Sequence, residues 1–318
     1  DVHSPGLHEN KTNERNDMTT GISVGRKARL NIDNKTVCIG TFSPKVFKEV
    51  VTNIDGHICG DLDPPVENLT RGRQMIAAQM TFDITEPLLD VVLPLLGITD
   101  LGSDVYELGK TDDVTAFDLT ADMVGSIHTL TNCYTASFGF VGQKGDRPSR
   151  LIWSVVGSSE TEAGSFTEDH LTFGKPFAFT HTTCTISGTG ADTARPIDRF
   201  QIFVDLNLVT EHNNSETLTD ATEGDRRAVF ATSVPYTSSH DDLHWTIKDD
   251  SGGKQAVIVL DNGTKTVTFT MPRGIGQGEI GEVGGKANQI RVPLSFNLFR
   301  YMDGGTRVSP LKIAITDS

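Results

Sequence analysis

Polar and apolar residues alternate along most of the chain, and Thr, Val, Ile and Phe recur at the alternating positions. A period of two places successive side chains on opposite faces of a strand, so this pattern predicts antiparallel sheets with one face buried. The clearest predicted strands are Arg26–Ile32, Met75–Ile84, Thr135–Val141, Leu151–Val156, Phe200–Asp205, Val229–Val234, Gln289–Phe299 and Leu311–Thr316.

One hairpin is signalled by its turn as well as by its strands. Asp261-Asn262-Gly263 separates the alternating runs Ala256–Leu260 and Thr266–Thr270. Asn and Gly adopt positive φ at low cost, so a tight primed turn is expected between two paired strands.

Helix signals are few. The best is 85–93, where Thr85 is placed to cap, Glu86 and Pro87 suit the first turn, and Pro94 and Gly97 are expected to stop the helix. A weaker candidate is 239–245. One short helix for each large group of strands suggests a sheet with a helix packed on one face.

These elements suggest an internal repeat. The order of Gly-containing turn, strand and helix that begins at Thr70 recurs at Thr222, an offset of 152 residues. Each copy is preceded by a strand and a long polar loop, 53–69 and 207–221. We therefore predict an N-terminal arm at 1–24 and two similar domains at 25–165 and 166–318, each a β-sandwich or barrel with one short flanking helix.

Composition narrows the function. The chain has 318 residues, and 28 Lys and Arg face 42 Asp and Glu, a net charge of −14. Such an acidic chain repels the nucleic-acid backbone, which disfavours a conventional DNA reader. No apolar run approaches the roughly 18 residues of a membrane span, and residues 1–20 hold no apolar stretch of the signal-peptide kind. The four cysteines lie far apart without a Cys-x-x-Cys motif, which favours free or buried thiols.

Motifs for catalysis or cofactors are weak. The Gly276-x-Gly278-x-x-Gly281 string is followed by a strand and not by the helix that a dinucleotide site requires. The pairs His240/His244, His57/Cys59 and Asp61/Asp63 each lack the further ligands of a metal site. We expect no cofactor, no metal and no enzymatic activity.

Two segments carry a resemblance to a known family. The first runs through Pro196–Asn207, Asn213-Asn214-Ser215 and Gly224-Asp225-Arg226-Arg227 into strand 228–236; the second is Tyr134–Phe140, Gly145 and Leu151–Gly157. They resemble the major tail tube proteins of bacteriophages with long non-contractile tails, of the kind with two tube-like domains per chain. The endings 289–296 and 310–313 are also similar, whereas the first half has Arg71-Gly72-Arg73 in place of Gly-Asp-Arg.

The resemblance implies a structural virion protein. Such domains pair their edge strands and close rings, three chains supplying six domain positions, and the rings stack into the tube that conducts the genome. The resemblance implies self-association and contacts with the tape-measure, tail terminator and distal tail proteins. It also implies passage of double-stranded DNA without specific binding, assembly in the host cytoplasm and no membrane partner. The alternative is a secreted or surface β-sandwich that binds a carbohydrate or protein ligand.

Two groups of residues are candidates for these roles. We expect the two long loops and their bases to bridge adjacent rings. We expect acids on predicted strands to line a negatively charged bore along which DNA slides. The alternative is that these acids lie on the outer surface and serve solubility. The ring-stacking candidates are Asp55, His57, Asp61, Asp63, Glu67, Arg71, Arg73, Glu211, Asn213, Asn214, Glu216, Asp220, Asp225 and Arg226. The lumen candidates are Asp83, Asp118, Asp122, Glu160, Glu162, Asp205, Asp249 and Asp261.

Overall fold

The computed structural model describes most of the chain between residues 29 and 318. The described residues are 29–37, 41–52, 69–109, 114–123, 126–145, 148–162, 166, 168–172, 174–187, 194–212, 217–235, 252–278 and 291–318, with backbone alone at 45–52, 69–74, 235, 277 and 278. The predicted arm at 1–24 and the weaker helix candidate at 239–245 lie outside them.

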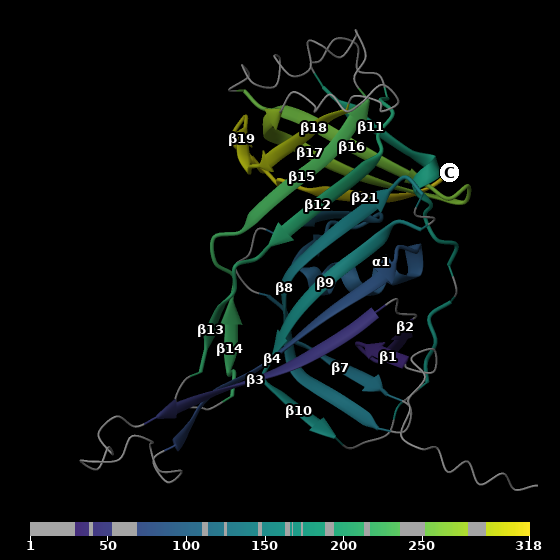
Figure 1. Ribbon diagram of the computed structural model, residues 1–318. Helices are drawn as coiled ribbons and strands as arrows, with labels where there is room; N and C mark the ends of the chain where they lie inside the picture. The colour runs from purple at the N-terminus through teal and green to yellow at the C-terminus, as the bar shows by residue number, and fades with distance from the viewer. Residues whose placement is uncertain are drawn as a thin grey trace, which may run out of the picture.

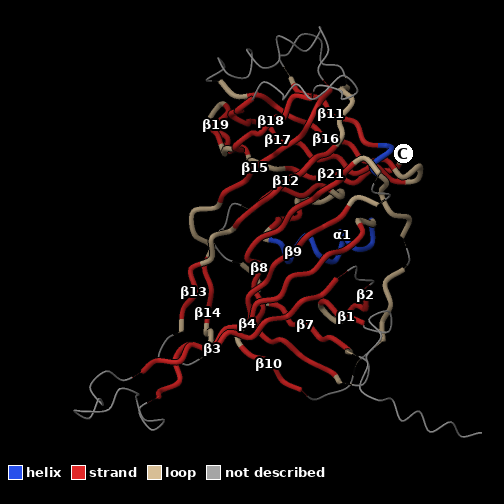
Figure 2. The backbone as a smooth tube through the Cα atoms, viewed as in Figure 1, coloured by secondary structure: helices blue, strands red, loops and turns tan. Residues whose placement is uncertain are grey.

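The described chain is mainly β, as the alternating pattern predicts, and every strand ladder in it is antiparallel (Figures 1 and 2). Seventeen strands form one connected network, and two short ribbons stand apart. The strands are β1 (Arg29–Ile32), β2 (Lys35–Val37), β3 (Thr41–Thr52), β4 (Leu69–Asp83), β5 (Ile98–Asp100), β6 (Val105–Leu108), β7 (Phe117–Asp122), β8 (Ile127–Gln143), β9 (Arg150–Gly157), β10 (Ser159–Glu162), β11 (Thr182–Ile186), β12 (Arg199–Asp205), β13 (Val209–Glu211), β14 (Asp220–Thr222), β15 (Arg227–Pro235), β16 (Lys254–Asp261), β17 (Lys265–Gly278), β18 (Arg291–Leu298), β19 (Tyr301–Asp303), β20 (Thr306–Val308) and β21 (Lys312–Asp317).

Among the described residues, helical structure is short and lies in the first half of the chain, apart from one turn. It comprises α1 (Glu86–Val92), the 3-10 helix η4 (Leu93–Leu96) and the 3-10 turn η5 (Phe179–His181). The predicted helix at 85–93 is confirmed, with two differences. Thr85 is the N-cap residue but its side chain makes no capping hydrogen bond. Pro94 does not end the helical segment, because it fits the first turn of η4, and Gly97 ends it with φ +72°.

The predicted hairpin at 256–270 is also confirmed, as the pair β16–β17. Its turn differs slightly from the expected one. Positive φ falls on Gly263 alone, at +81°, and not on Asn262. The Asn262 side-chain oxygen instead accepts the amides of Thr264 and Lys265 at 3.0 and 2.8 Å, which closes the turn from inside.

The strand pairings of the first half recur in the second. We call β1–β4 and β7–β10 the first strand set, and β11, β12, β15–β18 and β21 the second. The first set pairs in the order β3-β4-β9-β8, with β8 also pairing β7 and β10 and β7 pairing β1. The second set pairs in the order β12-β15-β18-β17, with β17 also pairing β16 and β21 and β16 pairing β11.

The registers coincide as well as the order. An offset of 152 carries β4 onto β15, one of 141 carries β9 onto β18, and one of 158 carries the first seven residues of β3 onto β12. Each of the ladders β4–β9 and β15–β18 therefore has eight pairs with equivalent ends. These ends are Ile76↔Gly157 and Asp83↔Arg150 in the first set, and Ala228↔Leu298 and Pro235↔Arg291 in the second.

Two ladders join the second set to the first half of the chain. β12 pairs the C-terminal half of β8 in the first set, and β21 pairs β6, which belongs to neither set. Figure 1 shows the green β12 and β15 continuing the sheet that β8 and β9 begin. Both ladders cross the domain boundary predicted between residues 165 and 166, and that boundary stays a prediction.

Apolar side chains from both sets form one continuous core. Trp153 lies at its centre in the first set, with its ring 5.1 Å from that of Phe117 and 6.4 Å from that of Phe82. Its indole Nε1 donates to Thr135 Oγ1 at 2.9 Å, and that hydroxyl donates to the Leu95 carbonyl at 2.6 Å. These two consecutive hydrogen bonds connect η4 to the sheet, and they leave the buried polar groups that form them with partners.

Candidate assembly interface

The ladder between β8 and β12 is the main contact of the two strand sets. Seven residue pairs form it, from Arg199↔Gln143 to Asp205↔Ser137. Gly139 leaves room for it, because a Cβ there would lie 3.1 Å from the Ile202 carbonyl oxygen and 3.3 Å from the Phe203 ring. A glycine within a strand allows another backbone or a large side chain to approach closely.

A small apolar cluster covers the sheet next to this ladder. β13 and β14 form a ribbon inside the segment that the sequence predicts as a loop, and Leu218 and Ala221 of that ribbon pack on Tyr134 of β8. The Tyr134 hydroxyl donates to Asp220 Oδ1 at 3.5 Å, and burial, followed by the Asp220 charge, raises the Tyr134 pKa. The hairpin between β12 and β15 of the second set is therefore seated on the first.

Arg226 fixes the base of that hairpin. Its Nη1 donates to the Gly109 carbonyl at 2.8 Å and its Nη2 donates to Glu223 Oε2 at 2.7 Å. The Glu223 side chain is only 5% exposed, so this ion pair is largely shielded from water. Arg226, one of the ring-stacking candidates, therefore pairs within the chain with Glu223.

A buried hydroxyl supports the ladder between β6 and β21. Ser309 Oγ lies 3.1 Å from the Leu108 carbonyl and 2.9 Å from the Leu311 carbonyl. Leu108 is the last residue of β6 and Leu311 directly precedes β21, so this hydroxyl lies at the end of the β6–β21 ladder. Lys312 Nζ lies 3.9 Å from Glu107 Oε2 across the same pair of strands. β6 and β21 thus form a joint that the alternating pattern alone does not identify.

The two sets differ in which edges are paired. In the second set, β12 pairs both β15 and β8, and β21 pairs both β17 and β6. Their counterparts β3 and β10 each pair one strand, β4 and β8 respectively, among the described residues. Pro44 sits within β3, which suits an edge strand because proline supplies no N–H to a ladder. The described first set therefore presents two open edges at the positions through which the second set is joined.

The ring-stacking candidates fall partly outside the described residues. Asp55, His57, Asp61, Asp63, Glu67, Asn213, Asn214 and Glu216 lie outside them, and Arg71 and Arg73 are described by backbone alone, in β4. Glu211 ends β13, Asp220 begins β14, and Asp225 precedes Arg226 at the base of the hairpin. β3 and β4 continue their pairing to Thr52↔Leu69, so the two strands form a long β-ribbon (Figure 1).

The lumen candidates do not share one face. Thr120 pairs Thr129 and Thr129 pairs Thr161, so these three side chains lie on one face of the sheet that contains β7, β8 and β10. Glu160 and Glu162 flank Thr161 and therefore project from the opposite face. Asp122 lies two residues from Thr120, on the Thr120 face. One bore wall cannot display both groups.

Most of the lumen candidates have partners within the chain. Asp122 is buried and accepts Arg29 Nε at 3.2 Å. Glu160 Oε1 lies 2.8 Å from His128 Nδ1, and Asp83 Oδ1 lies 3.9 Å from Arg150 Nε. Asp205 accepts the Asn207 amide at 3.0 Å. Asp261 accepts the Gly263 amide, which with Ser318 lowers its pKa; Asp249 lies outside the described residues.

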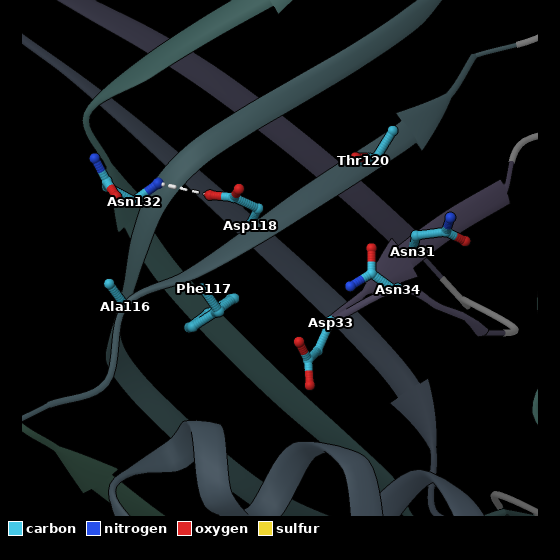
Figure 3. Close-up of a pocket in the computed structure, with 8 residues that line it drawn as sticks. All are labelled: Asn31, Asp33, Asn34, Ala116, Phe117, Asp118, Thr120 and Asn132. Carbon is cyan, nitrogen blue, oxygen red and sulfur yellow. Dashed lines mark hydrogen bonds between the residues drawn. The ribbon is translucent and has the colours of Figure 1, made fainter. Parts of the chain in front are cut away.

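Asp118 lines a polar hollow of about 400 Å³ beside the β1–β2 turn (Figure 3). Its Oδ1 accepts the backbone amide of Asn132 at 3.0 Å, and Asp33 and Asn34 face the same space. The described residues contain no group of three or more His, Cys, Asp or Glu side chains placed to hold a metal ion. The side-chain oxygens of Asp33, Asn34 and Asp118 in this hollow therefore do not form a metal site of that kind.

Comparison with known proteins gives no family. No protein-family model matches the sequence, and a search of curated proteins finds no significant match. Among the described residues, no helix has the length and apolar character needed to cross a membrane. The contacts above therefore carry the functional argument.

Sequence reasoning did not identify the residues that join the two sets. Tyr134, Phe203 and Leu218 all lie in or beside segments that the pattern marks, but alternation specifies a strand and not its partner. A usable signal was Gly139 within a strongly alternating strand, because an isolated strand glycine often marks a close backbone approach.

Proposed function

We propose that this protein is a structural subunit that associates with copies of itself through open strand edges and builds a tube of the phage-tail kind. The observation that carries the proposal is the inequality of the two strand sets. β12 is paired across to β8 of the first set and β21 is paired to β6 in the first half of the chain, whereas their counterparts β3 and β10 have open edges among the described residues.

An open edge on a long strand favours association with another chain, because its N–H and C=O groups lack partners. β3 has twelve residues and follows the same path as β12 over its first seven. A contact in which one side of a molecule binds a different side of the next is heterologous, and it closes into a ring when its rotation closes. With two repeats per chain, three chains give six equivalent positions.

The charge of the chain fits the same role. A net charge of −14 gives a surface that repels duplex DNA, which carries about one negative charge per 1.7 Å of axis. A conduit should bind its cargo weakly. In this proposal the chain belongs to the virion, assembles in the host cytoplasm around a tape-measure protein, and meets terminator and distal tail proteins at the tube ends.

The test is direct observation of assembly. Purified full-length chain is examined by sedimentation velocity over a range of concentrations and by negative-stain electron microscopy. Rings or tubes of uniform diameter, with a ring mass three times that of the chain, are the expected result. A chain that remains monomeric at every concentration contradicts the proposal and leaves the ligand-binding β-sandwich as the better reading.

A further inference from the structure

An exposed apolar patch lies on β17 and at the end of β18, and its Phe299 borders the same pocket as Arg226 and Ser309. Ile275 pairs Asn297, and the Phe299 amide donates to the Arg273 carbonyl at 3.0 Å, so these four side chains share one face of the sheet. We call them the β17 patch. Ile275 is 42% exposed and Phe299 is 46% exposed, unusual values for large apolar side chains that are neighbours on a sheet.

The β17 patch has a counterpart in the first set. The offset of 141 that carries β9 onto β18 places Val156 on Asn297, and the strand partners of those two residues are Tyr134 and Ile275. We call Tyr134 and Val156 the β8 patch. Tyr134 is only 6% exposed, because Leu218 and Ala221 of the second-set hairpin pack on it. The position of Tyr134 is thus covered in the first set, whereas the equivalent Ile275 is exposed in the second.

From this difference we infer that the β17 patch is the seat for the β3–β4 hairpin of a second copy of this chain. The inference rests on the proposed self-association and specifies its contact. β3 and β4 correspond to β12 and β15, whose connecting ribbon covers the β8 patch within one chain. The same hairpin in the next molecule would cover the β17 patch and add β3 to the edge of β17.

The internal joint also specifies the register between copies. Asp205 pairs Ser137 where the sets meet, and the offsets place Phe47 on Asp205 and Gln277 on Ser137. Phe47 of one copy should therefore lie opposite Gln277 of the next. Because the side-chain period of a strand is two, a shift of one residue would turn every side chain to the other face.

Charge supports the same occupant. The segment between β3 and β4, residues 53–68, contains four acids and neither Lys nor Arg. The β17 patch includes Arg273, whose guanidinium stacks on the Tyr301 ring at 5.4 Å, and exposed Arg300 lies next to Phe299. An acidic segment approaching this surface meets opposite charge, which favours encounter and orientation.

The first experiment replaces the exposed apolar side chain of the patch with a charge. Ile275→Asp would bury a carboxylate under the incoming hairpin and should raise the concentration needed for assembly by about tenfold or more. The matched control is Leu101→Asp, since Leu101 is 52% exposed and lies at the β5–β6 turn, outside the proposed contact. Circular dichroism establishes that both variants are folded, and sedimentation velocity measures their association.

The second experiment tests the register by disulfide cross-linking. Phe47→Cys with Gln277→Cys should yield intermolecular disulfides in a ladder that ends at the closed ring. The shifted pair Phe47→Cys with Gly276→Cys should yield few, because one of its thiols points to the opposite face. Both pairs are made with Cys38→Ser and Cys59→Ser, while Cys133 and Cys184 are buried and remain.

The outcomes separate this inference from the proposed function. A wild-type chain that assembles while Ile275→Asp assembles equally well, or while both cysteine pairs cross-link alike, overturns the inference and leaves the proposed function standing. A wild-type chain that never associates overturns both. Loss of assembly in Ile275→Asp but not in Leu101→Asp, together with the selective cross-link, supports the contact.

Discussion

Phe203 of β12 lies across Gly139 of β8, and a methyl group added at Gly139 would meet the Phe203 ring at 3.3 Å. The two strands approach closely here because Gly139 has no side chain. The contact stands at the middle of the ladder that unites the two strand sets, so it links local sequence to the arrangement of the whole molecule.

Gly139→Val should weaken this ladder. The larger side chain must displace the Phe203 ring or the Ile202 carbonyl, and such overpacking costs roughly 1–3 kcal/mol in the free energy of unfolding. Denaturant unfolding followed by fluorescence measures the change. Ser137→Val is the matched control, because it adds a β-branched residue on the same face of the same strand without a crowded Cβ position; an equal loss in both variants would show that the close approach is unimportant.

Thr135→Val should destabilise the first strand set. The substitution preserves shape but removes the hydroxyl that accepts from Trp153 and donates to the Leu95 carbonyl, leaving two buried polar groups without that partner. An unsatisfied buried group costs about 1–3 kcal/mol. Thr135→Ser keeps the hydroxyl, so its free energy of unfolding, measured by chemical unfolding, should stay close to that of the wild type. Equal destabilisation by Ser and Val would point to packing instead of hydrogen bonding.

Cys133 and Cys184 should resist alkylation in the folded protein. Burial raises the pKa of each thiol to about 12, so at pH 8 roughly one molecule in ten thousand carries the reactive thiolate. Ionisation increases as pH rises toward that pKa, so labelling should accelerate with pH. Mass spectrometry of peptides after iodoacetamide treatment gives the extent, with guanidinium-unfolded protein as the fully labelled reference. Rapid native labelling of either residue would contradict its burial.

Local features of the fold could be predicted from the sequence, and long-range ones could not. Alternation located β4, β8, β9 and β12, and the offset of 152 found in the sequence is also the offset that carries β4 onto β15 in the paired registers. Pairing between β8 and β12 depends on residues about sixty positions apart in the chain, and period two carries no information on partners. The coverage of Tyr134 and exposure of Ile275 follow from that pairing, so they were not foreseen.

Removal of residues 55–65 should separate ring formation from stacking. The deletion shortens the predicted ring-stacking loop but leaves β3 and β4, whose pairing ends at Thr52↔Leu69. Folded protein that still forms rings but no long tubes is the expected result in electron micrographs, with a higher concentration needed for rings because three acids that favour the β17 contact are lost. This variant contrasts with Ile275→Asp, which should block the ring itself. Long tubes of normal appearance from the deleted chain would contradict a stacking role for this loop.

The position of the bore can be tested with two carboxylates on the same sheet. Glu162 and Asp118 are exposed, and Glu162 lies on the face opposite to that of Thr120 and the Asp118 hollow. If either face lines a DNA conduit, a lysine there is repeated in every chain of the tube and attracts the phosphate backbone. Glu162→Lys and Asp118→Lys are therefore matched substitutions that differ in the face they occupy.

Only one of the two lysine variants should slow the passage of DNA. The measurement is the rate of genome release from tailed particles assembled with each variant, compared at low and moderate salt. Slowing should be greater at low salt, because the Debye length is about 30 Å at 0.01 M and about 8 Å at 0.15 M, so the added charge acts over a longer range. Tube assembly should persist in the variant that slows release, because a bore wall is not a contact between chains. Unchanged release in both variants at low salt would show that neither face lines the bore and that these acids serve the solubility of the outer surface.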